Sequence, residues 1–146
     1  MEAMCGLTSR RKRSDRGAAA VEFAIVLPIF LMLVFGAIDF GYYLYVTEIV
    51  TNAAREGARA GSVVALGVGQ DAVASKTASD TTKSYLTNAG LTKTATINAQ
   101  TTGAGTDLSV DVAVSYPVGS LSGFFGTGAK VALPANTTAH AVMRWQ

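Results

Sequence analysis

Residues 18–46 read AAAVEFAIVLPIFLMLVFGAIDFGYYLYV, and this stretch decides the fold. It is nearly all apolar, with Glu22 and Asp39 as its only carboxylates. As a helix, the 21 residues from Ala18 to Ile38 would rise about 31 Å, close to the thickness of a bilayer's hydrocarbon core. Asp39 then falls at the far interface. The tyrosines expected of an aromatic belt follow it, at Tyr42, Tyr43 and Tyr45.

A basic leader precedes the apolar stretch. Five of the 12 basic residues and two of the ten acidic residues lie within residues 1–17, so the remainder holds seven basic and eight acidic residues. The positive-inside rule therefore predicts a single pass through the inner (cytoplasmic) membrane, with the N-terminus in the cytoplasm and Phe40 onward outside. Because the remainder has no excess of Lys and Arg, it is not expected to bind nucleic acid.

Two simpler interpretations of the apolar stretch must be considered. A cleaved secretory signal is disfavoured, because the stretch is longer than a usual h-region and no small-residue cleavage site follows at the expected distance. The sequence Ala58-Arg59-Ala60 has suitable letters but lies well beyond the span, in a helical pattern. An uncleaved signal anchor fits the hydropathy equally well, so the residues at the start of the stretch have to decide.

Arg16-Gly17-Ala18-Ala19-Ala20-Val21-Glu22-Phe23 resembles a type IV prepilin processing site. The resemblance implies that a prepilin peptidase cuts after Gly17, so that Ala18 begins the mature chain and Glu22 is its fifth residue. Many type IV pilins begin with an aromatic residue, and Ala18 departs from that habit. The single cysteine, Cys5, would be lost with the leader.

The longer run from Arg16 to Ser62 resembles the TadE-like minor pilins (pseudopilins) of tight-adherence pili. The matching letters are RGAAAVEFA, the Leu27-Pro28 pair, FGAIDFG and TNAAREGARAG, which ends at Gly61. The resemblance implies a structural subunit whose partners are a prepilin peptidase, other pilin-like subunits, the pilus assembly machinery and membrane lipid. The chain is much longer than the major pilin of such systems, which favours an accessory or initiating role.

Charge and helix geometry suggest roles for two residues of the span. After cleavage, Glu22 could pair with the Ala18 ammonium of a neighbouring subunit, which would offset part of the desolvation of both charges and set the axial register. Pro28 removes one backbone hydrogen bond, so a local kink is expected there.

Small residues recur every four positions beyond the span. They form one helical stripe made of Ile49, Ala53, Gly57 and Gly61, and such residues permit close approach of another element. The stripe is interpreted as the seat of the chain's own domain, with a partner's helix as the alternative. Arg55 and Arg59 are interpreted as a solvated or salt-bridged face with Glu56.

The remainder of the chain predicts a small domain with one helix and several strands. A loop around residues 61–69 leads to a helix over 71–88, with Asp71 as its N-cap and Gly90 as its stop. Alternating apolar residues predict strands over 92–101, 108–116, 130–133 and 137–145, with a Gly103–Gly105 turn and a break at Pro134. Residues 117–128 are expected to form a loop with Phe124 and Phe125 beneath it.

The predicted class is α+β, a long N-terminal transmembrane helix that continues outside the membrane and packs on a small antiparallel sheet with one additional helix. The predicted parts are a leader (1–17), a long helix (18–62) and an extracytoplasmic α+β domain (63–146). His140 is the single histidine and is interpreted as an ordinary strand residue, with Asp107 and Asp111 as solvated side chains. No catalysis, cofactor or metal is predicted. An uncleaved, membrane-tethered binding or adhesion module is the alternative function.

Overall fold

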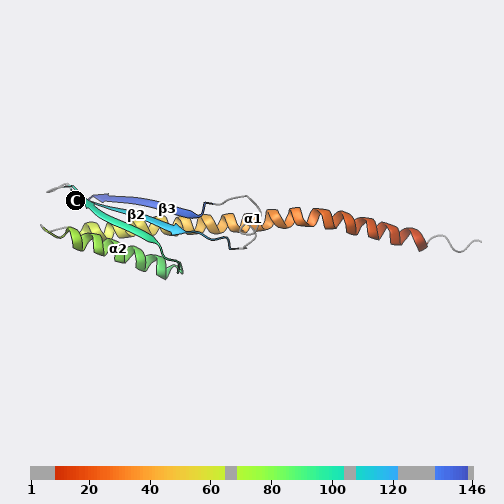
Figure 1. The fold of residues 1–146 in the computed structure, drawn as a ribbon, viewed down its shortest axis with the longest axis horizontal. Coiled ribbons are helices and arrows are strands. Elements are labelled where there is room, and N and C mark those ends of the chain that lie inside the picture. The colour runs from red at the N-terminus through yellow and green to blue at the C-terminus, as the bar shows by residue number, and fades with distance from the viewer. Residues whose placement is uncertain (1–8, 65–68, 104–107, 122–133, 145–146) are drawn as a thin grey trace, which may run out of the picture.

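The computed structural model describes residues 9–64, 69–103, 108–121 and 134–144. Figure 1 shows one long rod whose N-terminal half projects alone and whose C-terminal half lies within a small domain. The α+β prediction is confirmed. In chain order the elements are α1 (Ser9–Val64), α2 (Asp71–Asn88), β1 (Thr96–Thr102), β2 (Ser109–Pro117) and β3 (Asn136–Arg144).

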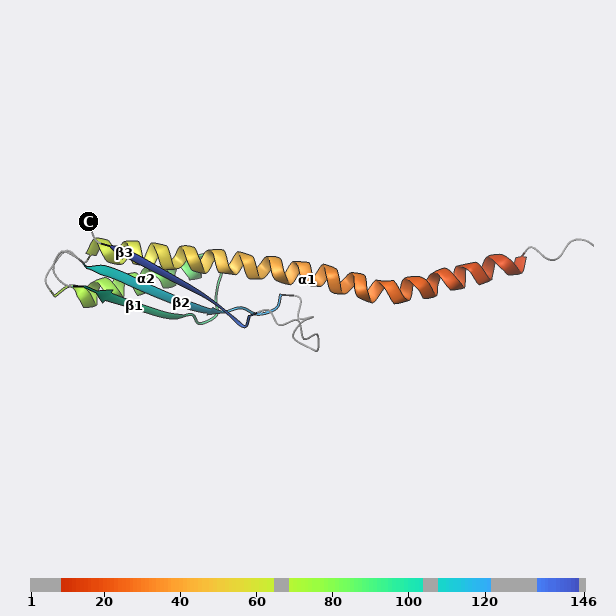
Figure 2. The same cartoon turned by 90° about the horizontal axis from the view of Figure 1, so that it is seen from above.

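Helix α1 is continuous over 56 residues, which corresponds to a length of about 84 Å. It runs through Pro28, and its N-terminal half curves gently in Figure 2. It begins at Ser9 rather than Ala18 and ends at Val64 rather than residue 62. Gly61 therefore lies in the last turns of the helix, and the predicted loop over residues 61–69 is wrong for its first four positions. Packing explains the difference, because Gly61 is buried against the domain.

Helix α2 has the predicted bounds but not the predicted N-cap. Gln70 occupies that position, and its side chain makes no capping hydrogen bond. Asp71 instead lies in the first turn, where a carboxylate interacts favourably with the helix dipole. The carbonyl of Gln70 accepts the first hydrogen bond of the helix, from the amide of Ala74 at 2.9 Å.

Gly90 ends α2 as predicted, and the geometry shows why. Its φ of +80° lies in the left-handed region that glycine adopts without a steric cost. The amide of Gly90 donates to the carbonyl of Thr87, and the amide of Leu91 donates to that of Leu86, both at 3.0 Å. This is the Schellman pattern, and it places two buried leucines on either side of the turn.

Within the described residues the sheet is antiparallel, three-stranded and ordered β1-β2-β3. Ile97 pairs with Val114, and Val112 pairs with Ala141. Strand β1 begins at Thr96, later than predicted. The backbone before it bonds to a side chain and not to a neighbouring strand, since the amide of Lys93 donates to the Tyr116 hydroxyl at 3.2 Å. The predictions for Phe124, Phe125, Asp107 and residues 130–133 lie outside the described residues.

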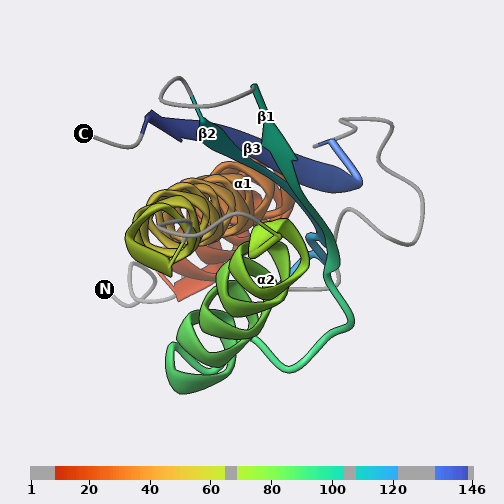
Figure 3. The same ribbon diagram turned by 90° about the vertical axis from the view of Figure 1, so that its left-hand side faces the viewer.

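Both helices lie on the same face of the sheet. Seen along the rod in Figure 3, α1 and α2 lie side by side, and the sheet passes over them. Strand β2 alternates strictly, so every second side chain enters the interface between the layers. The core consists mostly of small and branched residues that allow close packing: Val46, Val50, Ala53, Ala54 and Ala58 of α1, Ala78 and Leu86 of α2, Leu91 after α2, and Val110, Val112 and Val114 of β2, with Tyr116 as its aromatic member.

Candidate membrane and assembly helix

The N-terminal half of α1 presents large apolar side chains on all sides. Phe23 is 65% exposed and Leu33 is 69% exposed, and Val21, Ile25 and Ile29 are comparable. The helix is long and apolar enough to cross a membrane. So large an apolar surface requires lipid or other subunits around it, because water does not tolerate it.

The three residues predicted for processing and register lie at the start of this exposed segment. Gly17, Ala18 and Glu22 are all exposed, and nothing lies within 4 Å of a Cβ added at Gly17. Ala18 and Glu22 are one turn apart on the same helix face, as residues at positions i and i+4. The geometry thus leaves the Gly17-Ala18 junction accessible and places Ala18 on the helix face that holds the Glu22 carboxylate.

The predicted helix-packing residues lie against α2 and β2. Ala53, Gly57 and Gly61 are buried, and Ile49 is half-buried at the edge of the core. A Cβ at Gly57 would overlap the Thr82 hydroxyl and lie 2.8 Å from the carbonyl oxygen of Ala78. A Cβ at Gly61 would lie 2.9 Å from Val110 Cγ1 and 3.1 Å from the carbonyl oxygen of Ala74. The stripe therefore allows α1 to touch the backbone of α2.

Thr82 fills the space that Gly57 leaves. It is fully buried, and its hydroxyl donates to the carbonyl of Ala78 at 2.8 Å, so its polar atom is satisfied within α2. The sequence singled out Gly57 by its periodicity but gave no signal for Thr82. In the sequence Thr82 is one of many threonines in a polar helix, and only the three-dimensional packing distinguishes it.

Asp39 is the second residue that sequence reasoning placed incompletely. It was expected at the membrane interface, yet it is only 1% exposed, and the Ser120 hydroxyl donates to its Oδ2 at 2.7 Å. The two residues are 81 positions apart, and no local pattern links them. A carboxylate shielded from water needs such donors, because an unpaired buried charge is costly.

Two contacts between polar side chains lie on the outside of the domain. Arg59 donates to Glu56 at 2.7 Å, which confirms the salt-bridged face predicted for these residues. Hydrogen bonding to the Arg59 guanidinium holds the pKa of the Glu56 carboxyl below its ordinary value. Strand pairing also brings His140 Nε2 within 2.6 Å of Asp111 Oδ1 on the open face of the sheet, where solvation alone had been predicted for Asp111.

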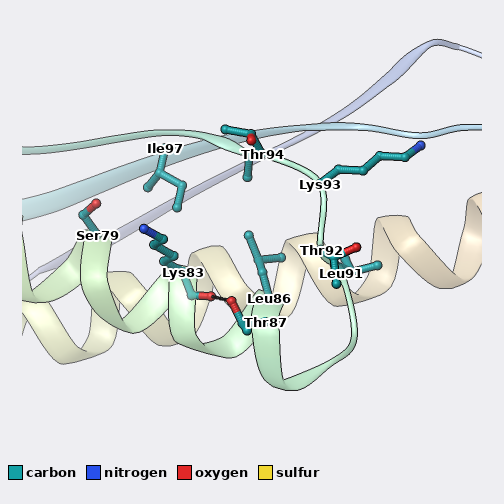
Figure 4. A pocket seen from close by; sticks show the side chains of 10 residues that line it. Ser79, Lys83, Leu86, Thr87, Leu91, Thr92, Lys93, Thr94 and Ile97 are labelled. Atoms are coloured by element: carbon teal, nitrogen blue, oxygen red, sulfur yellow. Dashed lines mark hydrogen bonds between the residues drawn. The ribbon is translucent and has the colours of Figure 1, made fainter.

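A cavity of about 510 Å³ opens between α2 and β1. In Figure 4, Lys83 rises from α2 toward Ile97 of β1, while Lys93 points away from the opening. The described residues that line the cavity include no carboxylate and no histidine, so the cavity offers no acid–base pair. Among the described residues, no group of three or more His, Cys, Asp or Glu side chains could hold a metal ion.

Fold and site together define a class of protein with one apolar helix that suits a membrane and a small α+β domain built on the far half of that helix. The particular family follows from a comparison of sequences. The family described as TadE-like protein matches residues 17–59, so the resemblance is confirmed and the chain is TadE-like over this segment.

TadE-like proteins are structural and assembly components of pili rather than enzymes, which associates the protein with a tight-adherence pilus and its other components. The apolar helix accords with a single-pass membrane protein of such a system. No curated protein and no solved structure matches the chain.

Proposed function

We propose that the protein is a minor pilin-like subunit (a pseudopilin) for assembly of a tight-adherence pilus. A prepilin peptidase would remove residues 1–17, leaving α1 from Ala18 to Val64 and an extracytoplasmic domain built on its far half. The single observation that supports this most is a coincidence of positions. The family match begins at residue 17, at the glycine of an exposed Gly17-Ala18 junction, one turn before Glu22 on an apolar helix.

Cleavage would change how the helix can move. The leader holds five basic residues, which favour the cytoplasmic side of the inner membrane and resist passage through lipid. Without them, the exposed helix from Ala18 onward carries Glu22 as its only ionisable side chain before Asp39. Such a helix can move from the bilayer into the similarly apolar environment provided by the packed helices of a fibre.

Glu22 would set the register of the subunit within that fibre. The Ala18 ammonium of a neighbour is the charge it is proposed to meet, and in an apolar surrounding the pairing offsets part of the cost of desolvating both groups. A shift by one residue would leave both charges unpaired. The proposal thus assigns one residue to recognition between subunits and leaves the remaining apolar contacts to provide affinity.

Mass spectrometry of the protein extracted from membranes tests the cleavage. The expected N-terminus is Ala18, and Gly17→Arg is expected to retain the leader. Ser14→Arg is the matched control, because it adds the same charge three residues earlier without altering the junction. An intact leader on the wild-type protein would refute the cleavage and favour the alternative function, an uncleaved tether that displays the domain for binding or adhesion.

Co-purification with pilus components tests Glu22. Glu22→Gln is expected to be cleaved normally but to recover far less of the other subunits. Glu48→Gln is the control, since Glu48 is an exposed carboxylate of the same helix whose contact is to Asn52. Equal recovery of partners by both variants would show that Glu22 has no role in register.

A further inference from the structure

The apolar surface of α1 does not stop where the predicted span stops. Beyond Asp39, Phe40 is 53% exposed and Tyr45 is 55% exposed, and Leu44 is similar. From Ile38 to Tyr45 the helix rises about 10 Å, which exceeds the thickness of one interfacial layer of a bilayer. The apolar exterior therefore reaches through the headgroup region to the base of the domain.

One segment of the domain comes down to the same level. After β2, the chain continues along α1 toward its N-terminal half, as Figures 1 and 2 show. Val110 lies beside Gly61, and Ser120 bonds to Asp39. The 22 helical residues between Asp39 and Gly61 rise about 33 Å, and the ten residues between Val110 and Ser120 cover about 33 Å when extended. The segment is thus nearly straight.

This descending segment (Pro117–Leu121) is fastened at two points. The amide of Val118 donates to the carbonyl of Ala135 at 2.9 Å, which ties it to the chain entering β3. The Ser120 hydroxyl donates to Asp39 at 2.7 Å, which ties it to α1. Leu121 follows immediately and is 63% exposed. A large apolar side chain is thereby held at the level of Asp39 with its surface open.

The carboxylate at this level is turned inward. Asp39 would be the most unfavourable group at a lipid boundary, but its carboxylate is buried and bonded to Ser120. The exposed side chains described at this level include the large apolar ones of Ile38, Phe40 and Leu121, together with the small Ser120. A single exposed leucine is ordinary, whereas one held at the level where a membrane helix exposes its own apolar side chains adds to that apolar surface.

We infer that the descending segment lies on the bilayer, with Leu121 inserted among the lipids of the extracytoplasmic leaflet. The domain then rests directly on the membrane and does not stand away from it on a bare helix. Lipid is the occupant because the surface is continuous with the predicted span. The inference rests on the membrane placement given under the proposed function and does not depend on cleavage of the leader.

Depth-dependent quenching of single labels tests this in the full chain. Cys5→Ser removes the one cysteine, and Leu121→Cys then takes a fluorescent label in nanodiscs that hold one copy each. Lipids with quenchers near the headgroup should quench this label several-fold more than a label at Thr102→Cys, which is exposed at the far end of β1. Ser120→Ala, which releases the fastening, should reduce that difference.

Equal quenching at Leu121 and Thr102 would overturn the inference. Quenching that appears only when several copies share a disc would overturn it as well, since a neighbouring subunit would then bring the label to lipid. A label at Leu33→Cys, within the span, checks the membrane placement separately, with lipids that carry quenchers on their acyl chains. If that label is not quenched, the proposed function fails at its anchor. If the label at Leu33 is quenched and the label at Leu121 is not, the membrane placement holds and only the inferred contact of the domain with lipid is wrong.

Discussion

Gly57 is the residue that most tightly limits the packing of α1 against α2. Its missing side chain admits the Thr82 hydroxyl and a backbone carbonyl of α2. Alanine is normally the better helix former by about 1 kcal/mol, but here any added carbon meets backbone that cannot turn aside. Because glycine is favoured over alanine at this helical position, a substitution here is a sensitive probe of the packing.

We predict that Gly57→Ala lowers the free energy of unfolding by about 1–3 kcal/mol, because α1 and α2 must separate to admit the methyl group. Gly41→Ala is the control, as nothing lies within 4 Å of a Cβ added there. Thermal unfolding of the detergent-solubilised full chain, followed by circular dichroism, measures both. An unchanged midpoint for Gly57→Ala would show that the two helices do not approach as described.

At the same scale, the Glu56–Arg59 pair predicts the direction in which the pKa of Glu56 is shifted on folding. Arg59 lowers the pKa of Glu56, so the pair stabilises the fold above the carboxyl's unfolded pKa and that contribution is lost as the pH falls through the lower folded value. Carbon NMR of the Glu56 carboxyl should show a folded pKa below that of an unperturbed glutamate. Arg59→Gln should return it to the ordinary value. Both groups are on the surface, so the effect on overall stability is expected to be slight.

At the scale of the element, β2 is the strand that joins the layers. It lies between the other two strands, and its inward side chains include the largest fully buried branched residues of the core. The sequence predicted this strand well, because strict alternation of apolar and polar residues is what a sheet with one covered face requires. The bounds of β3 were predicted equally closely, within one residue at each end, whereas β1 was predicted to begin four residues too early.

We predict that Val112→Ala costs about 2 kcal/mol, the effect of two buried methyl groups and the cavity they leave. Val142→Ala is the matched control, since Val142 lies on the open face of β3 and is exposed. It should cost about 0.5 kcal/mol or less. Urea unfolding of the solubilised chain gives both values, and equal losses would contradict the two-layer arrangement.

At the scale of the whole molecule, local patterns predicted the helices and the central strand, but contacts between distant segments escaped them. The stripe through Gly57 indicated that something packs closely, yet α2 and a neighbouring subunit were both compatible with it. The Ser120–Asp39 bond and the His140–Asp111 contact depend on how the chain returns on itself. The end of α1 was misplaced because glycine normally weakens a helix, whereas burial at Gly61 favours it.

Hydrogen exchange tests how the rod and the domain are joined. Val46 and Val50 are fully buried, and Thr47 bonds to Thr137 of β3, so the helix is clamped where it enters the domain. We predict that the amides of residues 43–50 exchange as slowly as those of residues 53–58 in the detergent-solubilised chain. Rapid exchange confined to residues 43–50 would indicate a hinge and contradict the prediction.

Because α1 is at once the rod and a central part of the domain's core, the rotation of one fixes the rotation of the other. If other helices hold the N-terminal half at a given azimuth, the open face of the sheet must point in a set direction, and successive copies would display that face along a regular spiral. Two added residues in the helix just after Ile38 would turn the domain by about 200°. A change of that size would expose a different face of the domain on the outside of the fibre, although no residue of the domain's surface had been changed.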